Sequence, residues 1–430
     1  MNNLGNKLFG EVKDLFPFLR SVNSIGNDKT LSYLKKKNET VSIKSFKCNK
    51  KYNDWKIPKK WVCSEAFILD RNNKKILDIK KNNLHVLNYS IAVKKTLSLR
   101  ELKKKIFTIK DQIDDIPYKT SYYKKNWGFC MSYNQYKNLK SGKYNVLINS
   151  KFLNEGMSYG EIYIKGKVKK EILLSTNICH PSMASNELSG PVILNNLMKK
   201  IQKKNNYFSY RALFIPETIG SIAYINENYE RLKKNVFCGL TLTCLGDNKL
   251  YSYVKSPVEK SYINQVVFSN FKNLKKKKIF PFTERGSDER NYNAPNVELD
   301  IGCITRSKFR EYKEYHTSSD NLKFISSSGL INSFKIIYKI IKSIEKNKIK
   351  KKYEVTTLGE PKLDKHKLRN SLGAPKKFKN FSKEVIDVWV YCNGKNDDIA
   401  ISKKTNIKLF KVKNILSLLI SKKLVKIKNE

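Results

Sequence analysis

The chain has 430 residues, of which 40% are hydrophobic and 11% aromatic. This composition excludes a disordered or fibrous protein, and the length predicts two to four domains with a large buried core. The sequence contains no apolar run near the roughly 18 residues of a membrane helix, and charged residues interrupt its start, where a signal peptide would be apolar. We therefore expect a cytoplasmic protein without membrane insertion.

Lys and Arg together number 86 against 38 Asp and Glu, which gives a net charge of +48. Such an excess ordinarily favours a nucleic acid or an anionic membrane as partner. The basic residues are spread over the whole sequence, together with many Asn, Ile and Tyr residues, as in proteins from AT-rich genomes. We therefore expect no sequence-specific binding of nucleic acid. The eight cysteines form no CxxC pair and are expected to be reduced.

The first part of the chain predicts two helices followed by a β-rich module. Apolar residues from Asn6 onward recur every three or four positions, and a short second helix is expected at 30–34. Residues 54–150 consist of short runs rich in aromatic and β-branched residues, separated by Asn, Lys and Gly. These runs, among them residues 84–93, predict strands.

Residues 160–348 alternate between strand and helix patterns. Strands are expected at 162–168, 171–178, 210–217 and 237–246, and helices at 190–204, 221–234 and 327–348. This alternation predicts the α/β fold class, with helices on the faces of the sheet. In the tail, two helices at 385–393 and 398–406, a longer helix from 409 and a final β-prone segment have the order of a winged helix. An ordinary packing or oligomerisation module fits the same pattern.

Polar residues capable of chemistry follow several of these strands. His180, Asn186 and Glu187 come after the strand 171–178, at the strand end where α/β proteins bind ligands. Glu217 ends a buried strand, where its pKa would be raised and it could act as a general base. A loop histidine without function and a glutamate of a first helical turn are the corresponding structural alternatives.

Two later segments add further candidates. The segment FTERGSDERNYNAP holds Arg285, Asp288 and Arg290 within a dense charge cluster, and His316 lies ahead of the last long helix of the α/β region. One divalent metal could be held by His180, Asp288 and His316, with Glu217 free as base. Zinc uses imidazole and carboxylate ligands and acidifies water, so hydrolysis of an amide is the expected chemistry.

Seven segments together resemble a bacterial family of aminopeptidase-like proteins from polysaccharide biosynthesis regions. They are LFPFLRS, KKNNLHVLNYS, WGFCMSYNQY, ICHPSMASNELSGP, FIPETIGSIAYI, FTERGSDERNYNAP and EYHTSSDNL. That family is similar to zinc aminopeptidases of the M28 type. The resemblance implies a phosphorylase/hydrolase-like α/β domain with helices on both faces of a mixed sheet, an inserted β-rich domain and a C-terminal winged helix. It covers nearly the whole chain.

The resemblance also assigns roles to single residues. His180 and His316 match the first and last metal-binding histidines, and Glu217 matches the catalytic base. Carboxylates of the two-metal pattern are replaced by neutral residues at three positions, Asn186, Thr218 and Thr243. A neutral amide is a poor bridge between two cations. We therefore expect at most one tightly held zinc ion per chain, or a metal site built partly from Asp288 and Glu187. Otherwise Asn186 and Glu187 are expected to bind the substrate or to support the metal ligands.

Two functions follow as hypotheses. The first is a zinc-dependent hydrolase of an amide in a small peptide-like or amino-sugar substrate, with Arg285 or Arg290 holding an anionic group. The second is a non-catalytic binding or regulatory protein on a degenerate peptidase scaffold, whose winged helix engages a partner or DNA. The expected domains are 1–53 with 151–350 (α/β), 54–150 (β-rich) and 356–430 (winged helix), and a homo-oligomer is left open.

Overall fold

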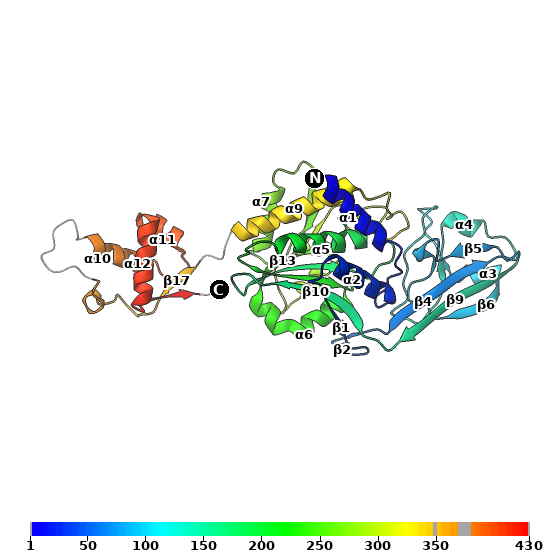
Figure 1. Cartoon of the computed structure of the whole chain (residues 1–430), viewed down its shortest axis with the longest axis horizontal. Coiled ribbons are helices and arrows are strands. Elements are labelled where there is room, and N and C mark those ends of the chain that lie inside the picture. Colours follow the sequence, from blue (N-terminus) through cyan, green and yellow to red (C-terminus); the bar gives the residue numbers. More distant parts are fainter. Residues whose placement is uncertain (1, 347–350, 369–379, 429–430) are drawn as a thin grey trace. The chain divides into compact units, whose positions relative to one another are not determined.

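The computed structural model describes residues 2–346, 351–368 and 380–428. It divides the chain into two compact units, Met1–Glu345 and Lys346–Glu430 (Figure 1). The first unit holds a large α/β sheet and a smaller antiparallel sheet, and the second holds helices and a two-stranded sheet. Across the described ranges, the search for a helix with the length and apolar character to cross a membrane finds none.

The large sheet has eight strands in the order β1-β10-β12-β11-β13-β16-β14-β15. Their bounds are β1 Ser42–Phe46, β10 Met157–Ile164, β11 Glu171–Asn177, β12 Ser209–Ile215, β13 Val236–Leu242, β14 Tyr251–Val254, β15 Lys277–Phe280 and β16 Ile301–Thr305. The central strands β12, β11, β13 and β16 are parallel, whereas β10 pairs antiparallel with β12 and β14 pairs antiparallel with β16. The expected mixed sheet is confirmed, although β10 begins before the predicted residues 162–168.

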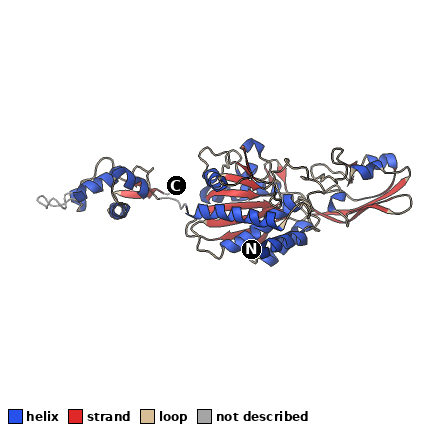
Figure 2. Ribbon diagram, turned by 90° about the horizontal axis from the view of Figure 1, so that it is seen from above, coloured by secondary structure: helices blue, strands red, loops and turns tan. Residues whose placement is uncertain are grey.

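Helices cover both faces of this sheet, as expected. Helix α5 lies on one face and α6 on the other, and α1 packs on α5 (Figures 1 and 2). The helices of this part are α1 Asn2–Leu15, α2 Ile25–Lys37, α5 Ser189–Ile201, α6 Ile219–Asn235, α7 Tyr262–Phe271, α8 Glu289–Tyr292 and α9 Ser327–Lys346. A short 3₁₀ turn, η3 (Phe282–Glu284), precedes α8.

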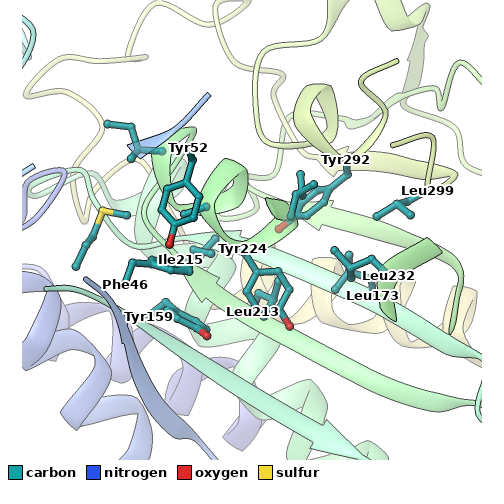
Figure 3. Close-up of a cluster of buried hydrophobic side chains, with 14 of the residues drawn as sticks. Phe46, Tyr52, Tyr159, Leu173, Leu213, Ile215, Tyr224, Leu232, Tyr292 and Leu299 are labelled. Carbon is teal, nitrogen blue, oxygen red and sulfur yellow. The ribbon is translucent and has the colours of Figure 1, made fainter. Parts of the chain in front are cut away.

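A buried apolar cluster joins α6 to the sheet (Figure 3). Leu213 and Ile215 of β12 both contribute to it, since side chains two apart on a strand point to the same face. Tyr224 of α6 is 1% exposed, and Tyr159 stacks on Phe46 with ring centroids 4.5 Å apart. This packing fixes β12, whose carboxyl end carries Glu217.

The smaller sheet has the order β5-β4-β9-β6, and all its strands are antiparallel. Its strands are β4 Lys60–Leu69, β5 Lys75–Asp78, β6 Val93–Ser98 and β9 Lys143–Leu153. The same region holds α3 Leu99–Lys103, α4 Tyr133–Lys137 and the two-residue strands β7 Ile106–Phe107 and β8 Phe129–Cys130. The two-residue strands β2 Lys51–Tyr52 and β3 Trp55–Lys56 form a hairpin that packs against α6. The boundaries at 54 and 150 stay predictions, and β9 extends past the second.

The strand expected over residues 84–93 is wrong. The structure has a 3₁₀ turn there, η1 (Asn83–His85), followed by a loop up to β6. The side chain of Asn82 accepts a hydrogen bond from Leu84 N at 2.9 Å and so caps the turn. The apolar residues that suggest a strand, Leu84, Val86 and Leu87, are instead buried from irregular backbone.

The second unit has its own core. Its elements are β17 Lys352–Val355, η4 Leu363–His366, α10 Asn380–Val390, α11 Asp398–Thr405, α12 Leu409–Ser421 and β18 Val425–Lys428. The three expected helices and the final strand are present, and β17, which pairs with β18, was not predicted. The winged-helix assignment stays a prediction. The boundary proposed at residue 350, the end of the helix predicted to 348 and residues 369–379 of the tail lie outside the described ranges.

Candidate active site

The predicted site residues gather at the carboxyl ends of the parallel strands. The His180 segment follows β11, Glu217 follows β12, and Thr243 follows β13. His316 lies in the connection between β16 and α9. Because parallel strands end at one edge of a sheet, these segments converge in the crevice where α/β folds bind ligands.

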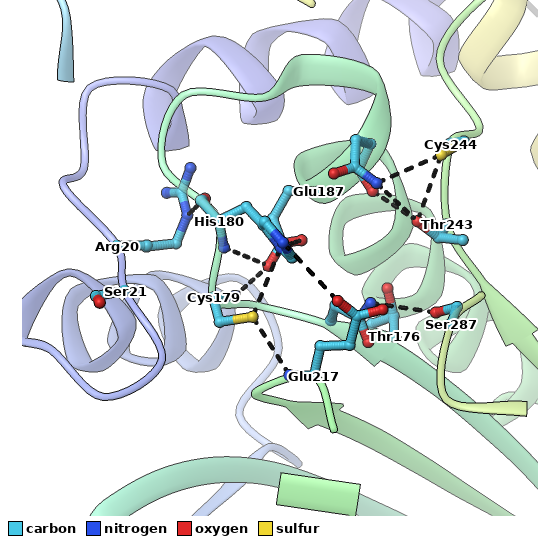
Figure 4. Close-up of polar contacts among 12 residues, drawn as sticks. Arg20, Ser21, Thr176, Cys179, His180, Glu187, Glu217, Thr243, Cys244 and Ser287 are labelled. Carbon is cyan, nitrogen blue, oxygen red and sulfur yellow. Dashed lines mark hydrogen bonds and ion pairs between the residues drawn. The ribbon is translucent and has the colours of Figure 1, made fainter. Parts of the chain in front are cut away.

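Glu187 holds His180 with both of its carboxylate oxygens (Figure 4). Oε2 lies 2.7 Å from His180 Nδ1, and Oε1 accepts hydrogen bonds from the backbone N–H groups of Cys179 and of His180, the latter at 2.9 Å. Burial alone would lower the pKa of His180, but the Glu187 carboxylate raises it well above its ordinary value. The Nε2 atom is left to face Glu217, whose Oε2 is 3.8 Å away. Histidines that bind a metal ion through one ring nitrogen commonly donate a hydrogen bond from the other ring nitrogen to a carboxylate.

His316 lies beside His180, with the two ring centroids 5.1 Å apart. Its ring stacks on Tyr315 at 3.9 Å, and its Nε2 atom is buried without a hydrogen-bond partner among the described residues. Burial, together with the neighbouring His180, lowers the pKa of His316 well below its ordinary value. The imidazole is therefore neutral, which is the form that binds metals.

Glu217 occupies the place expected of a general base. Its backbone N–H donates to Cys179 Sγ at 3.3 Å, and its side chain is 21% exposed. Burial raises the pKa of Glu217 to about 7, and Asp288 adds to the rise while His180 and Arg290 oppose it. A carboxyl group with such a pKa can exchange protons near neutrality.

Asp288 directly precedes α8, and its side chain contacts the start of α6. Its Oδ1 accepts hydrogen bonds from Thr218 N at 2.9 Å and from Ser221 Oγ at 2.8 Å, whereas Oδ2 is buried and lacks a partner within the described residues. These bonds hold Thr218 at a φ of 66°, in the left-handed region that non-glycine residues rarely adopt. Burial raises the pKa of Asp288 to about 6.

The predicted ligand set is not drawn together as a compact group. A search of the described residues for three or more His, Cys, Asp or Glu ligand atoms within 4.8 Å of one another gives only Cys179, His180 and Glu187. Burial raises the pKa of the Cys179 thiol to about 11, and Glu187 is already occupied by hydrogen bonds. These two residues therefore fit a supporting role better than metal binding. The set His180, Asp288 and His316 stays a prediction.

Neutral side chains stand where the resemblance expects three carboxylates. Asn186 Nδ2 is 3.5 Å from Thr243 Oγ1, and the Thr243 hydroxyl donates to the backbone carbonyl of Asn186 at 2.7 Å. Arg290 donates to Thr218 Oγ1 and so lies at the site. Arg285 is exposed and lies over the Phe282 ring at 5.1 Å; within the described part of the chain, no hydrogen bond or ion pair connects it with the site.

The site has unsatisfied capacity for a cation. Asn186 Oδ1, Asp288 Oδ2 and His316 Nε2 are buried and have no hydrogen-bond partner in the described ranges. Buried polar atoms are nearly always paired, so each of these three atoms indicates a missing partner. Two imidazoles and a carboxylate are a usual donor set for zinc, and the residues present therefore fit that ion.

Tyr118, which lies between β7 and β8, was not predicted as a site residue. Its ring centroid is 5.1 Å from that of His180 and 5.2 Å from that of His316, edge to face in both cases. Tyr118 N donates to the His316 carbonyl at 2.9 Å, next to a bridge between Pro117 and Thr317. No local pattern marks this tyrosine, because it lies about 200 positions from His316 in the sequence and meets it only through the fold.

Asp320 was likewise missed as a supporting residue. It is fully buried and accepts hydrogen bonds from Ser185 N at 2.7 Å and from Asn186 N at 2.9 Å. It thereby connects the His316 loop with the segment that carries Asn186 and Glu187. Its short spacing from His316 was the one signal available in the sequence.

Comparison with known proteins identifies relatives along nearly the whole chain. Residues 9–347 match a family model described as a domain of unknown function, DUF4910. A Clostridium acetobutylicum protein, provisionally named a polysaccharide biosynthesis protein with an aminopeptidase-like domain, is 34% identical over 410 residues, which cover 95% of this chain and 93% of the relative. A crystal structure from the same species, provisionally described as a peptidase, has a TM-score of 0.79 at 34% identity and covers 99% of this chain and 97% of that one.

More distant structures share the fold alone. BSAP, a zinc aminopeptidase from Bacillus subtilis, has a TM-score of 0.58 at 10% identity and covers 79% of this chain and 94% of its own. An M28 peptidase precursor from Shewanella amazonensis has a TM-score of 0.56 at 12% identity, with 81% and 96% covered. The chain therefore belongs to the DUF4910 family and to the bacterial aminopeptidase-like proteins, named for polysaccharide biosynthesis, that its motifs resemble.

Proposed function

We propose that this protein is a zinc-dependent hydrolase that cleaves a peptide-like or acylamino amide bond, in a small peptide-like or amino-sugar substrate of surface polysaccharide biosynthesis. One observation carries the proposal. His180 is fixed at Nδ1 by Glu187 and turns Nε2 toward Glu217. The ring of His316 lies beside it, and its buried Nε2 has no partner among the residues that the structure describes. Metal-assisted hydrolysis requires imidazoles that can bind the metal ion and a carboxyl group whose pKa lets it carry a proton near neutrality.

His180, His316 and Asp288 would hold one zinc ion. A bound zinc ion supplies Lewis-acid polarisation of the scissile carbonyl and acidifies water. A second ion is not part of the proposal, since Asn186, Thr218 and Thr243 offer no negative charge to balance it. BSAP, which is described as a zinc aminopeptidase, supports the choice of metal, although its likeness to this chain is one of fold.

Glu217 would act as the proton carrier. Its carboxylate takes a proton from the attacking water as the new C–O bond forms, and returns it to the leaving amine as the C–N bond breaks. Arg290, which donates to Thr218 Oγ1, is placed to bind an anionic group of the substrate. Arg285 is exposed, and a role for it in substrate binding rests on its position in the sequence alone.

Metal analysis of the purified protein tests the proposal. We expect about one zinc ion per chain, and loss of that zinc in both His180→Ala and His316→Ala. His366→Ala, in the second unit, is the matched control and should retain the metal. Stoichiometric zinc in the His180→Ala/His316→Ala double variant would show that the site is wrongly placed. A screen of aminoacyl and acylamino-sugar amides then identifies the bond that is cleaved.

A specific observation favours the alternative of a non-catalytic binding protein. Neutral residues stand at three positions where the resemblance implies carboxylates. Asn186 and Thr243 form hydrogen bonds with each other, and Thr218 accepts one from Arg290, so these positions form a polar network without metal-binding carboxylates. On this reading the crevice binds a small ligand, and the tail engages a partner. Protein that is free of metal after purification, binds none when zinc is added and cleaves none of the amides would support it.

A further inference from the structure

A cavity of about 520 Å³ lies near the start of α9, and none of the candidate active-site residues lines it. Its walls come from the segment before β14, from the loop between α7 and β15, from the residue after β16 and from the first turns of α9. Arg306, Lys249, Lys275 and Lys276 bring four basic side chains to it, and Lys249 is paired with Glu314. Its volume is in the range of small-molecule sites.

Arg306 is the unusual member of this lining. It is 4% exposed, and its Nε and Nη1 atoms are buried without a hydrogen-bond partner among the residues described. Its guanidinium carbon lies 3.9 Å from the centroid of the Tyr251 ring. No carboxylate of the described chain forms an ion pair with it, although other buried arginines, such as Arg211, are paired with glutamates.

A buried arginine without an acidic partner is energetically unfavourable. The guanidinium remains protonated in proteins, and removing its charge from water is compensated only by an opposite charge and good hydrogen bonds. The Tyr251 ring offsets part of this penalty through a cation–π interaction. It cannot satisfy the donors Nε and Nη1, so the positive charge at this cavity has no opposite charge among the described residues.

The surroundings of Arg306 favour a phosphate group. Lys275 and Lys276 are exposed at the cavity, and Ser328 belongs to the first turn of α9, whose N-terminus attracts anions. Asn248 Nδ2 donates to Ser328 Oγ at 2.6 Å and fixes this hydroxyl. A planar guanidinium fork combined with ammonium groups and a helix N-terminus is a combination suited to tetrahedral oxyanions.

We propose that the cavity at Arg306 binds the phosphate group of a small phosphorylated molecule. The site is independent of the proposed hydrolase function, because Arg306 and the lysines take no part in holding zinc or in proton transfer. A purely structural Arg306, satisfied by its stacking on Tyr251, is the alternative.

Ligand-induced thermal stabilisation and calorimetry with inorganic phosphate test the proposal. At physiological ionic strength, where exposed charges are screened beyond about 8 Å, phosphate should raise the unfolding midpoint of the full chain in a saturable way. Glucose 1-phosphate, sulfate and acetate form the other arms of the experiment. We expect the sugar phosphate to bind at least as tightly as phosphate, and acetate to have no effect. Acetate binding as tightly as phosphate would contradict phosphate recognition.

Arg306→Met separates the two explanations. It keeps an unbranched side chain over Tyr251 and removes the unpaired charge, so the ligand-free protein should be as stable as the parent or more stable, while the phosphate response should disappear. The matched control Arg100→Met removes one exposed charge in the inserted region and should keep the full response. A parent protein without a saturable response, or an Arg306→Met protein that keeps it, would overturn the proposal.

A second variant does not depend on how well Arg306→Met folds. Lys275→Gln/Lys276→Gln changes only exposed side chains and should weaken phosphate binding by about tenfold, since charge-assisted contacts are lost. The consecutive exposed lysines Lys203 and Lys204, which are not among the cavity residues, supply the matched control pair when both are changed to Gln. Equal weakening by the two pairs would show that phosphate binds only through the general positive charge of the chain.

Discussion

At the scale of single residues, Glu187 determines what His180 can do. One oxygen accepts from the two backbone N–H groups at Cys179 and His180, and the other lies 2.7 Å from Nδ1. The ring is thereby fixed in orientation with Nδ1–H toward Glu187, and a metal ion bound at Nε2 would displace the proton that the raised pKa of His180 keeps there. Glu187 follows Asn186, the position where the resemblance implies a metal-bridging carboxylate. It thus supports His180, the first histidine.

Glu187→Gln should weaken zinc binding by about 10-fold to 100-fold, the usual effect of losing such a support. The amide lacks the negative charge that holds the imidazole, and its nitrogen cannot accept a hydrogen bond. Competition with a zinc chelator measures the affinity, and the exposed residue Glu230, changed to Gln, is the control. An affinity equal to that of the parent would mean that His180 does not depend on Glu187.

Glu217 gives a pH-dependent prediction. The pKa of its carboxyl group is raised to about 7, chiefly by burial, and only the ionised form accepts a proton. The value of kcat/KM should therefore fall as the pH decreases through about 7, whereas a carboxylate of ordinary pKa would stay active to about 4.5. Glu217→Gln should lower hydrolysis by about 10² to 10⁴ and retain zinc. A variant as fast as the parent would assign Glu217 a structural role.

At the scale of elements, the sequence patterns locate the central strands and helices well. The predicted ranges 171–178 and 210–217 correspond to β11 and β12, because buried parallel strands are short apolar runs that end at polar residues. Residues 84–93 were assigned wrongly because their apolar side chains are buried from a segment that pairs only through isolated bridges, such as Val86 with Phe129, rather than from a continuous strand. Local periodicity cannot distinguish these two causes of burial.

The candidate site was predicted where its residues follow strands and missed where they come from another region. His180, Glu217 and His316 lie near one another, as the motifs indicate. Tyr118 meets both histidines only because the segment around Pro117 pairs with the segment around Thr317. Such long-range pairing leaves no local signal in the residues around position 118, so it could not be predicted from the sequence pattern.

Tyr118, in the segment that pairs with the His316 loop, gives a prediction about zinc binding. Tyr118→Leu removes the ring that lies edge to face against both imidazoles, and we expect weaker zinc binding in a chelator competition, by about tenfold, because the histidine rings are no longer held. Tyr118→Phe keeps the ring and should retain the parent affinity. If the Phe variant were as impaired as the Leu variant, the hydroxyl group and not the ring would be responsible.

At the scale of the whole molecule, the chain divides into units with separate cores. The apolar cluster of the second unit is formed by residues between Tyr353 and Ile427, whereas the first unit buries apolar residues of its last helix, α9, as far as Ile344. The net charge of +48 belongs to both units, which agrees with a compositional origin of the excess. A cytoplasmic location, a homo-oligomer and the absence of sequence-specific nucleic acid binding remain predictions.

A chain that ends at Lys346, where α9 ends, should therefore fold as the first unit alone. Because every proposed zinc-binding and catalytic residue precedes residue 320, the shortened protein should contain the same zinc per chain and cleave the same amides as the full chain. Calorimetry should show the unfolding transition of the first unit at an unchanged midpoint, since no cluster residue is removed from it. The isolated tail, residues 351–430, is the complementary control and should bind no zinc. Aggregation of the shortened chain, or loss of its zinc, would show that the second unit completes the fold or the site of the first.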